Sequence, residues 1–320
     1  MNYFINKIEY YLPEKIIDNV FLESECGIER GFLENKIGIK FRHLAEKNES
    51  VSDMSFKAAK KLIDVNNIDA ESIDLLLVCT QNPDYKLPTT ACIVQDKLKL
   101  KTSCIAFDVN LGCSGFVYSV IIAGNFIKSN LIKNALIIMA DQYSKIINYK
   151  DRNTAPLFGD AASAILISES NEKNGVIDVD FGTDGSGAEN LIAYNSGVVR
   201  DDNKSSFLYM NGREVLKFSI TAVPESIAKI LERNKLTTKD VKYFVLHQAN
   251  KYLLQEISKA LGVADEQMII DLENYGNTVS STIPIALKNL VDKNCLHKGD
   301  LIILSGFGVG FSWGTILYEY

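Results

Sequence analysis

The sequence is poor in the residues from which metal sites and disulfides are built. It has three histidines, His43, His247 and His297, and its six cysteines include no C-x-x-C pair or other metal-ligand spacing. We therefore expect no metal site, and any histidine chemistry has few candidates. The scattered cysteines indicate free thiols in a reducing compartment.

Positive charge and long apolar runs are also scarce. The 34 Lys and Arg residues are outnumbered by 40 Asp and Glu residues, which gives a net charge of −6 and excludes the broad cationic surface that nucleic acids require. Apolar stretches such as residues 116–123 fall short of the ~20 residues that span a bilayer. The first eleven residues contain Asn6, Lys7 and Glu9 and lack the apolar core of a signal peptide. We expect a cytoplasmic protein with neither nucleic-acid nor membrane partners.

What the sequence does contain is an alternation of short apolar runs with longer helical patterns, which is typical of a mixed α/β fold with buried strands. We expect strands at residues 74–79, 135–140, 162–167, 242–246 and 301–304. We expect helices at residues 52–65, 88–98, 113–128, 215–234, 251–261 and 280–292. Residues 170–201, rich in Gly, Asn, Ser and Asp, indicate a connection between two halves.

An internal repeat accounts for the order of these elements. Matching segments are separated by 164, 167 and 165 residues in three pairs: Gly112 with Gly276, Thr80 with His247, and Leu136 with Leu301. Chance explains any one match, but three concordant offsets in chain order favour one βαβ-containing unit used twice. We expect two halves, residues 1–170 and 171–320, packed so that equivalent loops converge.

Cys113 is the cysteine with the most distinctive setting. It lies between Gly112 and Ser114-Gly115, at the expected start of an apolar helix. The unpaired N–H groups at a helix start favour the thiolate, and the flanking glycines let another backbone or a substrate approach. The alternative is a small buried cysteine that only packs.

Three further features lie where the repeat predicts convergence. His247 ends an apolar strand, where α/β sheets place ligand chemistry, although a structural histidine is an equal alternative. Asn277 carries an amide that donates at any pH, but Gly-Asn is also a common turn. The glycine-rich segment 306–314 lacks the G-x-G-x-x-G spacing of a phosphate loop. Its backbone N–H groups suit an oxyanion, and the alternative is a tight turn between strands.

At these residues the chain resembles the condensing enzymes of the thiolase superfamily, most closely the β-ketoacyl-acyl carrier protein synthase III group. Five motifs in order carry the resemblance: Asp108-Val-Asn-Leu-Gly-Cys113-Ser-Gly-Phe116, Phe158-Gly-Asp160-Ala-Ala, His247-Gln-Ala-Asn250, Tyr275-Gly-Asn277-Thr and Phe307-Gly-Val-Gly-Phe-Ser-Trp-Gly314. The resemblance implies a thiolase fold, in which two duplicated halves pack as an αβαβα layered sandwich. The first half would carry the nucleophilic cysteine and the second the histidine and asparagine.

The resemblance also implies an acyltransferase of fatty acid or specialised acyl-chain biosynthesis. Cys113, His247 and Asn277 would be catalytic, and the N–H groups of Cys113 and Val309 would form the oxyanion hole. An acyl-CoA primer would acylate Cys113 and then condense, with loss of carbon dioxide, with a malonyl thioester on the phosphopantetheine of acyl carrier protein. No tightly bound cofactor is expected.

Several residues for substrate binding follow from the same resemblance. Phe32 and Lys36 match a tryptophan that stacks on the CoA adenine and an arginine that meets the CoA phosphates, and Lys gives up the bidentate fork of Arg. Arg152 matches a second CoA contact. Three more positions are assigned to substrate binding: Gly212, Arg213 and Asn250.

The carrier-protein and acyl-pocket positions depart from the family pattern. Tyr252 replaces an arginine that faces the carrier protein, and Lys259 remains as a docking cation. Leu87 stands where the acyl pocket usually has phenylalanine, so the identity of the primer stays open. A homodimer is expected, since the family places its sheets edge to edge and the dimer wall shapes the acyl pocket. Two alternatives keep the scaffold: an acyltransferase to a hydroxyl or amine without decarboxylation, and a non-catalytic subunit that binds carrier protein.

Overall fold

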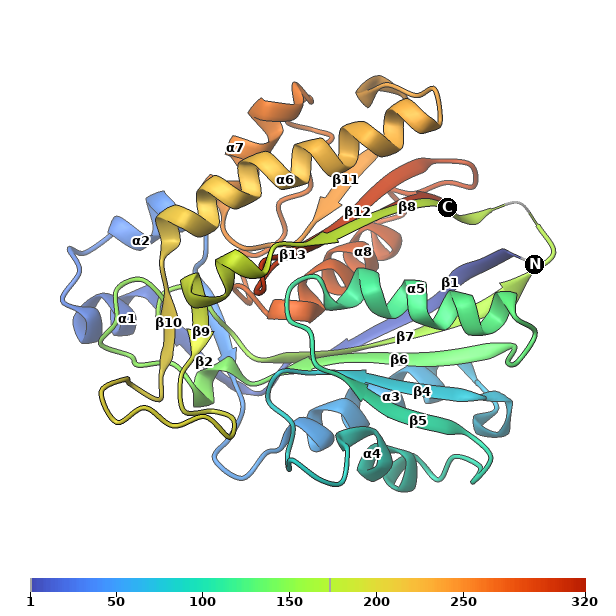
Figure 1. The fold of residues 1–320 in the computed structure, drawn as a ribbon, viewed down its shortest axis with the longest axis horizontal. Helices are drawn as coiled ribbons and strands as arrows, with labels where there is room; N and C mark the ends of the chain where they lie inside the picture. The colour runs from blue at the N-terminus through green and yellow to red at the C-terminus, as the bar shows by residue number, and fades with distance from the viewer. Residues whose placement is uncertain (1, 173) are drawn as a thin grey trace.

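Two mixed β-sheets and three layers of helices form the computed structural model, which describes residues 2–172 and 174–320 (Figure 1). The first sheet has the order β1-β7-β6-β4-β5, with bounds Asn2–Tyr11, Ala161–Ser170, Asn134–Asp141, Leu75–Cys79 and Ile105–Val109. The second has the order β8-β13-β12-β11, with bounds Gly175–Thr183, Ser312–Glu319, Leu301–Gly308 and Tyr243–Leu246.

The two sheets repeat one topology. In the first, β4 is parallel to β5 and β6, while β7 is antiparallel to β6 and β1. In the second, β11 is parallel to β12, while β13 is antiparallel to β12 and β8. A single parallel bridge from Phe244 to Met268 stands where the first sheet has β5. The predicted duplication is therefore confirmed as a property of the fold.

Helices fill the space between the sheets and cover their outer faces (Figure 1). Both α5 (Gly115–Lys128) and α8 (Thr282–Asp292) pack between the sheets. On the outside, α3 (Val51–Asn66) and α4 (Thr90–Leu98) cover the first sheet, and α6 (Gly212–Arg233) and α7 (Lys251–Leu261) cover the second. The order helix, sheet, helix, sheet, helix confirms the predicted αβαβα sandwich.

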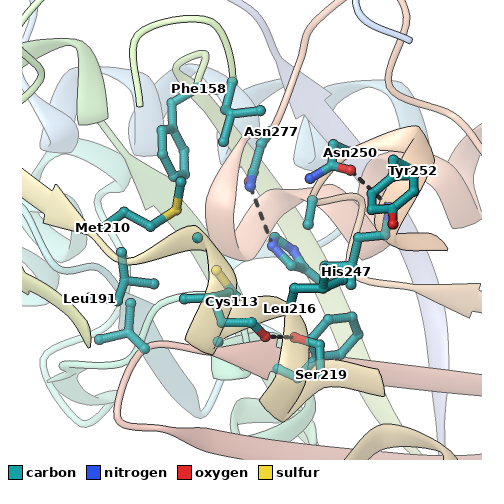
Figure 2. A pocket seen from close by; sticks show the side chains of 18 of the residues that line it. Cys113, Phe158, Leu191, Met210, Leu216, Ser219, His247, Asn250, Tyr252 and Asn277 are labelled. Atoms are coloured by element: carbon teal, nitrogen blue, oxygen red, sulfur yellow. Dashed lines mark hydrogen bonds between the residues drawn. The ribbon is translucent and has the colours of Figure 1, made fainter. Parts of the chain in front are cut away.

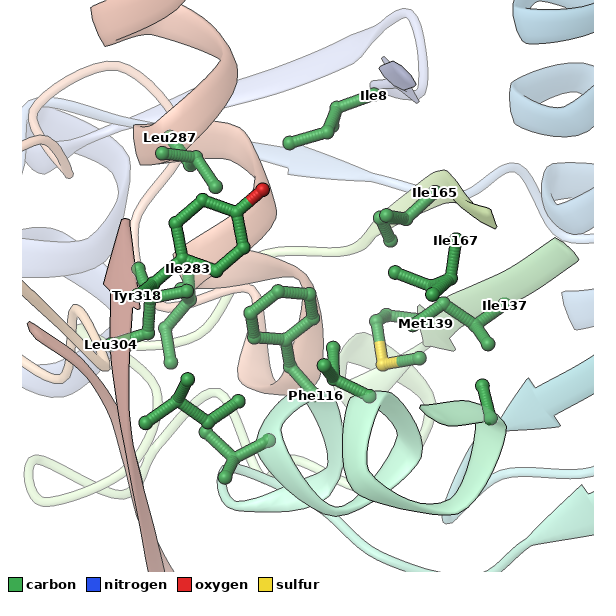
Figure 3. Packing of buried hydrophobic residues seen from close by; sticks show 14 of the residues in the cluster. Ile8, Phe116, Ile137, Met139, Ile165, Ile167, Ile283, Leu287, Leu304 and Tyr318 are labelled. Atoms are coloured by element: carbon green, nitrogen blue, oxygen red, sulfur yellow. The ribbon is translucent and has the colours of Figure 1, made fainter. Parts of the chain in front are cut away.

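The middle layer explains why the helix after Cys113 is apolar around most of its circumference. Figure 3 shows Phe116 of α5 packed among Ile283 of α8 and side chains of both sheets, including Met139 and Leu304. A helix between two sheets has no solvent face and must be apolar on both sides. Burial of each such side chain contributes roughly 1.5–3 kcal/mol. This packing fixes the ends of α5 and α8, from which the site is built.

Predicted and observed elements differ in several places, and the strands β1 and β5 of the first sheet were not among those expected. Helix α5 begins at Gly115 rather than Cys113, after a turn at residues 112–114. Helix α4 begins at Thr90 rather than Pro88, because Thr89 is extended. The segment 170–201 is more than a connection, since it contains β8, an edge strand in which Asp178 and Asp180 interrupt the apolar pattern. Shorter elements without such a signal are β2 (Lys15–Asp18), β3 (Phe41–Leu44), β9 (Leu191–Ala193), β10 (Leu208–Met210), α1 (Asn19–Cys26) and α2 (Phe32–Ile37).

Among the described residues there are also five 3₁₀ helices: Ala70–Ser72, Tyr143–Lys145, Gly185–Asn190, Thr238–Asp240 and Val279–Ser281. The strands of the first sheet end at Ser170 and those of the second begin at Gly175, on either side of the predicted boundary. Division of the chain into two domains at that boundary stays a prediction. Across residues 2–172 and 174–320, no helix has the length and apolar character needed to cross a membrane.

Candidate active site

The three residues predicted to be catalytic line one cavity of about 370 Å³. Cys113 lies in the loop before α5, His247 follows β11, and Asn277 lies just before the 3₁₀ turn Val279–Ser281 that leads into α8. Figure 2 shows the three side chains converging at the centre of the cavity. Equivalent loops of the two halves therefore meet, as the repeat predicted.

Glycines of β12 allow the second half to approach Cys113 closely. A Cβ atom at Gly306 would lie 2.6 Å from the Cys113 carbonyl oxygen, and one at Gly308 would lie 3.0 Å from Cys113 Sγ. Any side chain at these positions would push the two halves apart. The sequence offered two interpretations of the glycine-rich segment, a turn between strands and a backbone surface for an oxyanion. The segment forms the turn between β12 and β13, and its backbone also faces Cys113.

The Cys113 thiol is buried and lies against backbone donors. Its sulfur is within hydrogen-bond reach of the N–H groups of Cys113 itself and of Val309. Burial raises the pKa of the thiol to about 12, the charge of Asp141 adds to the rise, and the two backbone hydrogen bonds oppose it. The sequence led us to expect a favoured thiolate, but burial outweighs the helix start. Cys113 rests as a thiol.

His247 is buried and neutral. Its Nδ1 lies 2.7 Å from Thr282 Oγ1, and its ring meets the Phe307 ring edge to face at 5.7 Å. Burial lowers the pKa of the imidazole to about 3, and a backbone hydrogen bond with Val279 opposes this only in part. The ring therefore brings no net charge to the cavity at neutral pH.

The Asn277 amide is oriented by its own turn. Its Oδ1 accepts a hydrogen bond from the Val279 N–H at 2.9 Å, which leaves Nδ2 facing His247 Nε2 at 3.5 Å. Its backbone is held on both sides, since its N–H donates to Leu157 O at 2.9 Å and its carbonyl accepts from Gly159 N–H at 3.0 Å. Two neutral nitrogen-bearing groups thus face the same space, where a carbonyl oxygen can be bound.

The cavity has two chemically different ends (Figure 2). Phe158, Leu191 and Met210 lie on one side of the Cys113, His247 and Asn277 side chains, and the first two are buried. Asn250 and Tyr252 lie on the other side, and the Tyr252 side chain is half exposed. The cavity therefore runs from a solvent-facing mouth past the three central residues to an apolar inner end.

Tyr143 closes part of the inner end and was missed in the sequence. Its hydroxyl donates to Gln81 Oε1 at 2.6 Å, and its ring centroid lies 4.9 Å from that of Phe158. Tyr143 follows the buried strand β6, and a polar residue just beyond a buried strand is the signal that could have identified it.

The predicted substrate-binding residues divide into two groups. Gly212, Arg213 and Asn250 line the cavity, although the Asn250 side chain also accepts from Leu253 N–H at 2.8 Å and so caps α7. Phe32 and Lys36 lie on α2, outside the cavity lining, and the Phe32 side chain is exposed.

Three other predicted residues lie outside the cavity lining, and their predicted roles stay predictions. Arg152 donates from Nε to Cys26 O at 2.9 Å and from Nη2 to Gly27 O, so it holds the carbonyl end of α1. Lys259 pairs with Glu256 on its own helix at 2.6 Å. Leu87 is 83% exposed and does not line the cavity of a single chain. Within the described part of the chain, no group of three or more His, Cys, Asp or Glu side chains could hold a metal ion.

Comparisons with known proteins identify the family. The family model "3-Oxoacyl-[acyl-carrier-protein (ACP)] synthase III" matches residues 107–185, and the model of its C-terminal part matches residues 231–320. The chain is 36% identical to a beta-ketoacyl-[acyl-carrier-protein] synthase III of Clostridium tetani, covering 97% of this chain and 96% of that protein. It is 39% identical to the Campylobacter fetus protein of the same name, with coverage of 97% and 96%.

A solved structure agrees. A 3-oxoacyl-(acyl-carrier-protein) synthase III crystal structure superimposes with a TM-score of 0.96 at 34% identity, over 100% of both chains. The likeness thus extends over the whole fold and includes all the loops that form the cavity. The chain belongs to the beta-ketoacyl-[acyl-carrier-protein] synthase III family of acyl-transferring condensing enzymes.

Proposed function

We propose that the chain condenses an acyl-CoA primer with a malonyl thioester carried by acyl carrier protein, through an acyl-Cys113 intermediate and with loss of carbon dioxide. The observation that carries the proposal is the meeting of Cys113, His247 and Asn277 in one cavity. The thiol lies against two backbone N–H groups there, and the imidazole and the amide are neutral donors for a second substrate.

In the first half-reaction the sulfur of Cys113 attacks the thioester carbonyl of acyl-CoA. A bond forms from Sγ to the acyl carbon, the bond to the CoA sulfur breaks, and the thiol proton ends on the released CoA. The N–H groups of Cys113 and Val309 lie beside Sγ and stabilise the tetrahedral oxyanion. Each such donor contributes on the order of 3 kcal/mol to the transition state.

The two ends of the cavity assign places to the parts of the substrate. The apolar inner end, with Phe158, Leu191 and Tyr143, holds the acyl chain. The mouth, with Arg213, Asn250 and Tyr252, receives the pantetheine arm of CoA or of the carrier protein. Because Tyr143 is fixed by Gln81, its ring limits the depth available to the primer.

In the second half-reaction the malonyl thioester carbonyl takes the space between His247 and Asn277. Its oxygen accepts hydrogen bonds from Asn277 Nδ2 and from His247 Nε2–H, in the tautomer in which Nδ1 accepts from the Thr282 hydroxyl. The enolate that forms as carbon dioxide leaves is then stabilised without a change in the charge of either group. The carbanion attacks the acyl carbon on Cys113, the bond to Sγ breaks with its electron pair left on sulfur, and a β-ketoacyl thioester is released. The Cys113 thiolate takes up a proton from solvent, which restores the resting thiol. Burial of all three side chains keeps water from both intermediates.

The partner and assembly proposals rest on the surface. Leu87 and Tyr85 are exposed on the same loop, at 83% and 63%, which supports a homodimer in which a second copy covers them. Arg213 at the mouth and Lys36 on α2 are cations for an acidic carrier protein or CoA. Lys259 is proposed as a carrier-docking residue only in competition with its partner Glu256. The six free cysteines support a cytoplasmic location.

The test is to incubate the protein with acyl-CoA and malonyl-acyl carrier protein, following the mass of the intact protein and carbon dioxide release. We expect an acyl adduct that is absent from Cys113→Ala, together with carbon dioxide and a β-ketoacyl product. An adduct that passes to a hydroxyl or amine without carbon dioxide would replace this proposal with the non-decarboxylating acyltransferase. No adduct on the native protein would support a non-catalytic subunit.

A further inference from the structure

Arg42, in β3, is the largest fully buried side chain of the molecule's described part, and its exposed fraction is 0%. No carboxylate in residues 2–172 and 174–320 forms an ion pair with it, and each of its hydrogen-bond acceptors is neutral. A buried charge without a paired carboxylate is costly and is retained only where its hydrogen bonds are needed. The question is what those bonds hold.

The guanidinium holds the loop that runs beside Asn277. Its Nε donates to Pro156 O at 3.0 Å and its Nη2 donates to the same oxygen, so one carbonyl receives two bonds from a planar group. Its Nη1 donates to Asn19 Oδ1 at 2.6 Å and to Lys40 O at 3.2 Å. The Pro156 carbonyl is thereby tied to α1 and β3, two elements outside the cavity.

The loop transmits this constraint to Asn277 through backbone hydrogen bonds. Leu157, next after Pro156, accepts from Asn277 N–H at 2.9 Å, and Gly159 N–H donates to Asn277 O at 3.0 Å. The segments 157–159 and 276–278 form a parallel β-bridge at Phe158 and Asn277. The Asn277 backbone therefore rests on a loop whose position is set by the Arg42 guanidinium.

The stem of Arg42 supports the same turn from below. A Cβ atom at Gly276 would lie 3.2 Å from Arg42 Cγ and 2.8 Å from Leu157 O, and Gly276 has φ of 71°. Gly276 thus fits between the arginine stem and the loop with no room for a side chain. Loss of the arginine would free this turn to move, and with it the amide that faces His247.

We propose that Arg42 is a positioning residue for the second half-reaction: through the Pro156 carbonyl and the 157–159 loop it fixes the Asn277 amide at the carbonyl of the malonyl thioester. The inference rests on the proposed condensation. Arg42 touches neither substrate nor the Cys113 thiol, so its loss should lower decarboxylation more than acylation, to which the same loop contributes only the apolar lining residues Leu157 and Phe158. A displacement of about 1 Å in a catalytic donor is enough to cost up to about 100-fold in rate.

The first experiment separates the half-reactions in Arg42→Met, which keeps the stem and removes the donors, and in Arg42→Lys, which keeps the charge. We expect carbon dioxide release from malonyl-acyl carrier protein to fall by about 30-fold in Arg42→Met and less in Arg42→Lys, with Cys113 acylation within about threefold of native. Leu62→Ala, in the fully buried part of α3, is a control for general destabilisation and should leave both steps unchanged. An equal fall in both steps of Arg42→Met, or no fall in either, would overturn the inference.

The second experiment asks whether Arg42 acts through Asn277. In an Asn277→Ala background, adding Arg42→Met should lower carbon dioxide release by less than about twofold, because the group it positions is gone. Independent losses that multiply would overturn the inference. Asn19→Ala removes one acceptor of the guanidinium and keeps the arginine, so it tests the same step if Arg42→Met does not fold; it should give a smaller loss of the same kind. Carbon dioxide release that is much lower in Asn277→Ala than in the native protein supports the proposed function independently of either arginine variant.

Discussion

The two halves of the molecule use one topology to place different functional side chains at equivalent positions. In the first half the loop before the central helix carries Cys113, and the residue after the parallel strand β4 is Thr80. In the second half the corresponding loop carries Asn277, and His247 follows β11. The cysteine sulfur faces backbone N–H groups, whereas the second substrate meets side chains. Duplication thus supplied two positions that have taken different tasks.

Burial shifts the pKa values of Cys113 and His247 in opposite directions, and both shifts favour the neutral form. It raises the pKa of the Cys113 thiol and lowers that of the His247 imidazole, because in each case the charged form loses hydration. Both groups are neutral at rest. Charge therefore appears in the cavity only with the reacting substrate, where donors are already in place.

Removal of the nucleophile of the first half should cause the largest loss of activity. Cys113→Ala should abolish the acyl adduct and lower condensation by at least about 1,000-fold, since no other group in the cavity can form the thioester. Mass spectrometry of the intact protein after incubation with acyl-CoA measures the adduct. Cys92→Ala, at an exposed cysteine on α4, is the matched control and should acylate like the native protein. An adduct of normal yield on Cys113→Ala would contradict the assignment.

Removal of a side-chain donor in the second half of the molecule should impair decarboxylation and leave acylation of Cys113 intact. Asn277→Ala and His247→Ala should each lower carbon dioxide release by about 100- to 1,000-fold, the usual loss for one oxyanion donor. Acylation of Cys113 should stay within a few-fold of native. Single-turnover acylation and carbon dioxide release, measured on the same samples, make the distinction. An equal loss of acylation and carbon dioxide release would show that these side chains are not specific to the second half-reaction.

A substitution in β12 should instead slow acylation of Cys113, the first half-reaction. Gly308 has φ of 156°, and a Cβ there would lie 3.0 Å from Cys113 Sγ, so Gly308→Ala should displace Val309 N–H from the sulfur and slow acylation by about 10-fold. Rapid-quench measurement of acyl-enzyme formation tests this. Gly197→Ala introduces a methyl group into open space and is the control. Unchanged acylation in Gly308→Ala would remove Val309 from the proposed oxyanion hole.

Substitutions at the inner end of the cavity should change the preferred length of the acyl-CoA primer and have little effect on the other steps. Tyr143→Leu removes ring atoms beside Phe158, so longer acyl-CoA primers should acylate Cys113 several-fold better relative to short ones. Tyr143→Phe keeps the ring and loses only the bond to Gln81, so its preference should lie close to native. Competition between acyl-CoAs of different length, read by adduct mass, gives the ratio. An unchanged ratio in Tyr143→Leu would mean that the chain lies elsewhere.

The last expected effect is on stability below neutral pH and does not concern catalysis at neutral pH. The imidazole of an unfolded chain has a pKa near 6.5, whereas that of His247 is lowered to about 3. As pH falls from 6.5 toward 3, the unfolded state therefore binds a proton that the folded state refuses, and stability is lost by at most on the order of 1 kcal/mol per pH unit. His247→Gln lacks this term, so its denaturation midpoint should fall less steeply over that window. The buried Asp141, with a pKa raised to about 7, acts in both proteins and cancels. Equal slopes would contradict a buried neutral His247.

Local sequence signals predicted a mixed α/β chain with a duplicated unit and the residues that stand at element ends, and the family resemblance supplied the αβαβα architecture. Cys113, His247 and Asn277 each lie beside a strong apolar element, so periodicity and family resemblance are enough to locate them. Tyr143 and Arg42 were missed because what they hold, Gln81 and the Pro156 carbonyl, is far away in sequence. The thiol pKa was misjudged for the same reason, since burial by the second half is not visible in the residues around Cys113.

The contact of β12 with the Cys113 loop has a consequence for how this chain can change over generations. Because Gly306 and Gly308 bring the second repeat against the nucleophile of the first, each repeat has lost the freedom to vary alone. A gene encoding either copy by itself would specify half of a reaction centre, with a cysteine lacking the Val309 N–H or an Asn277 amide lacking the acylated cysteine opposite it. The duplicated units have become mutually dependent, and selection acts on them as one.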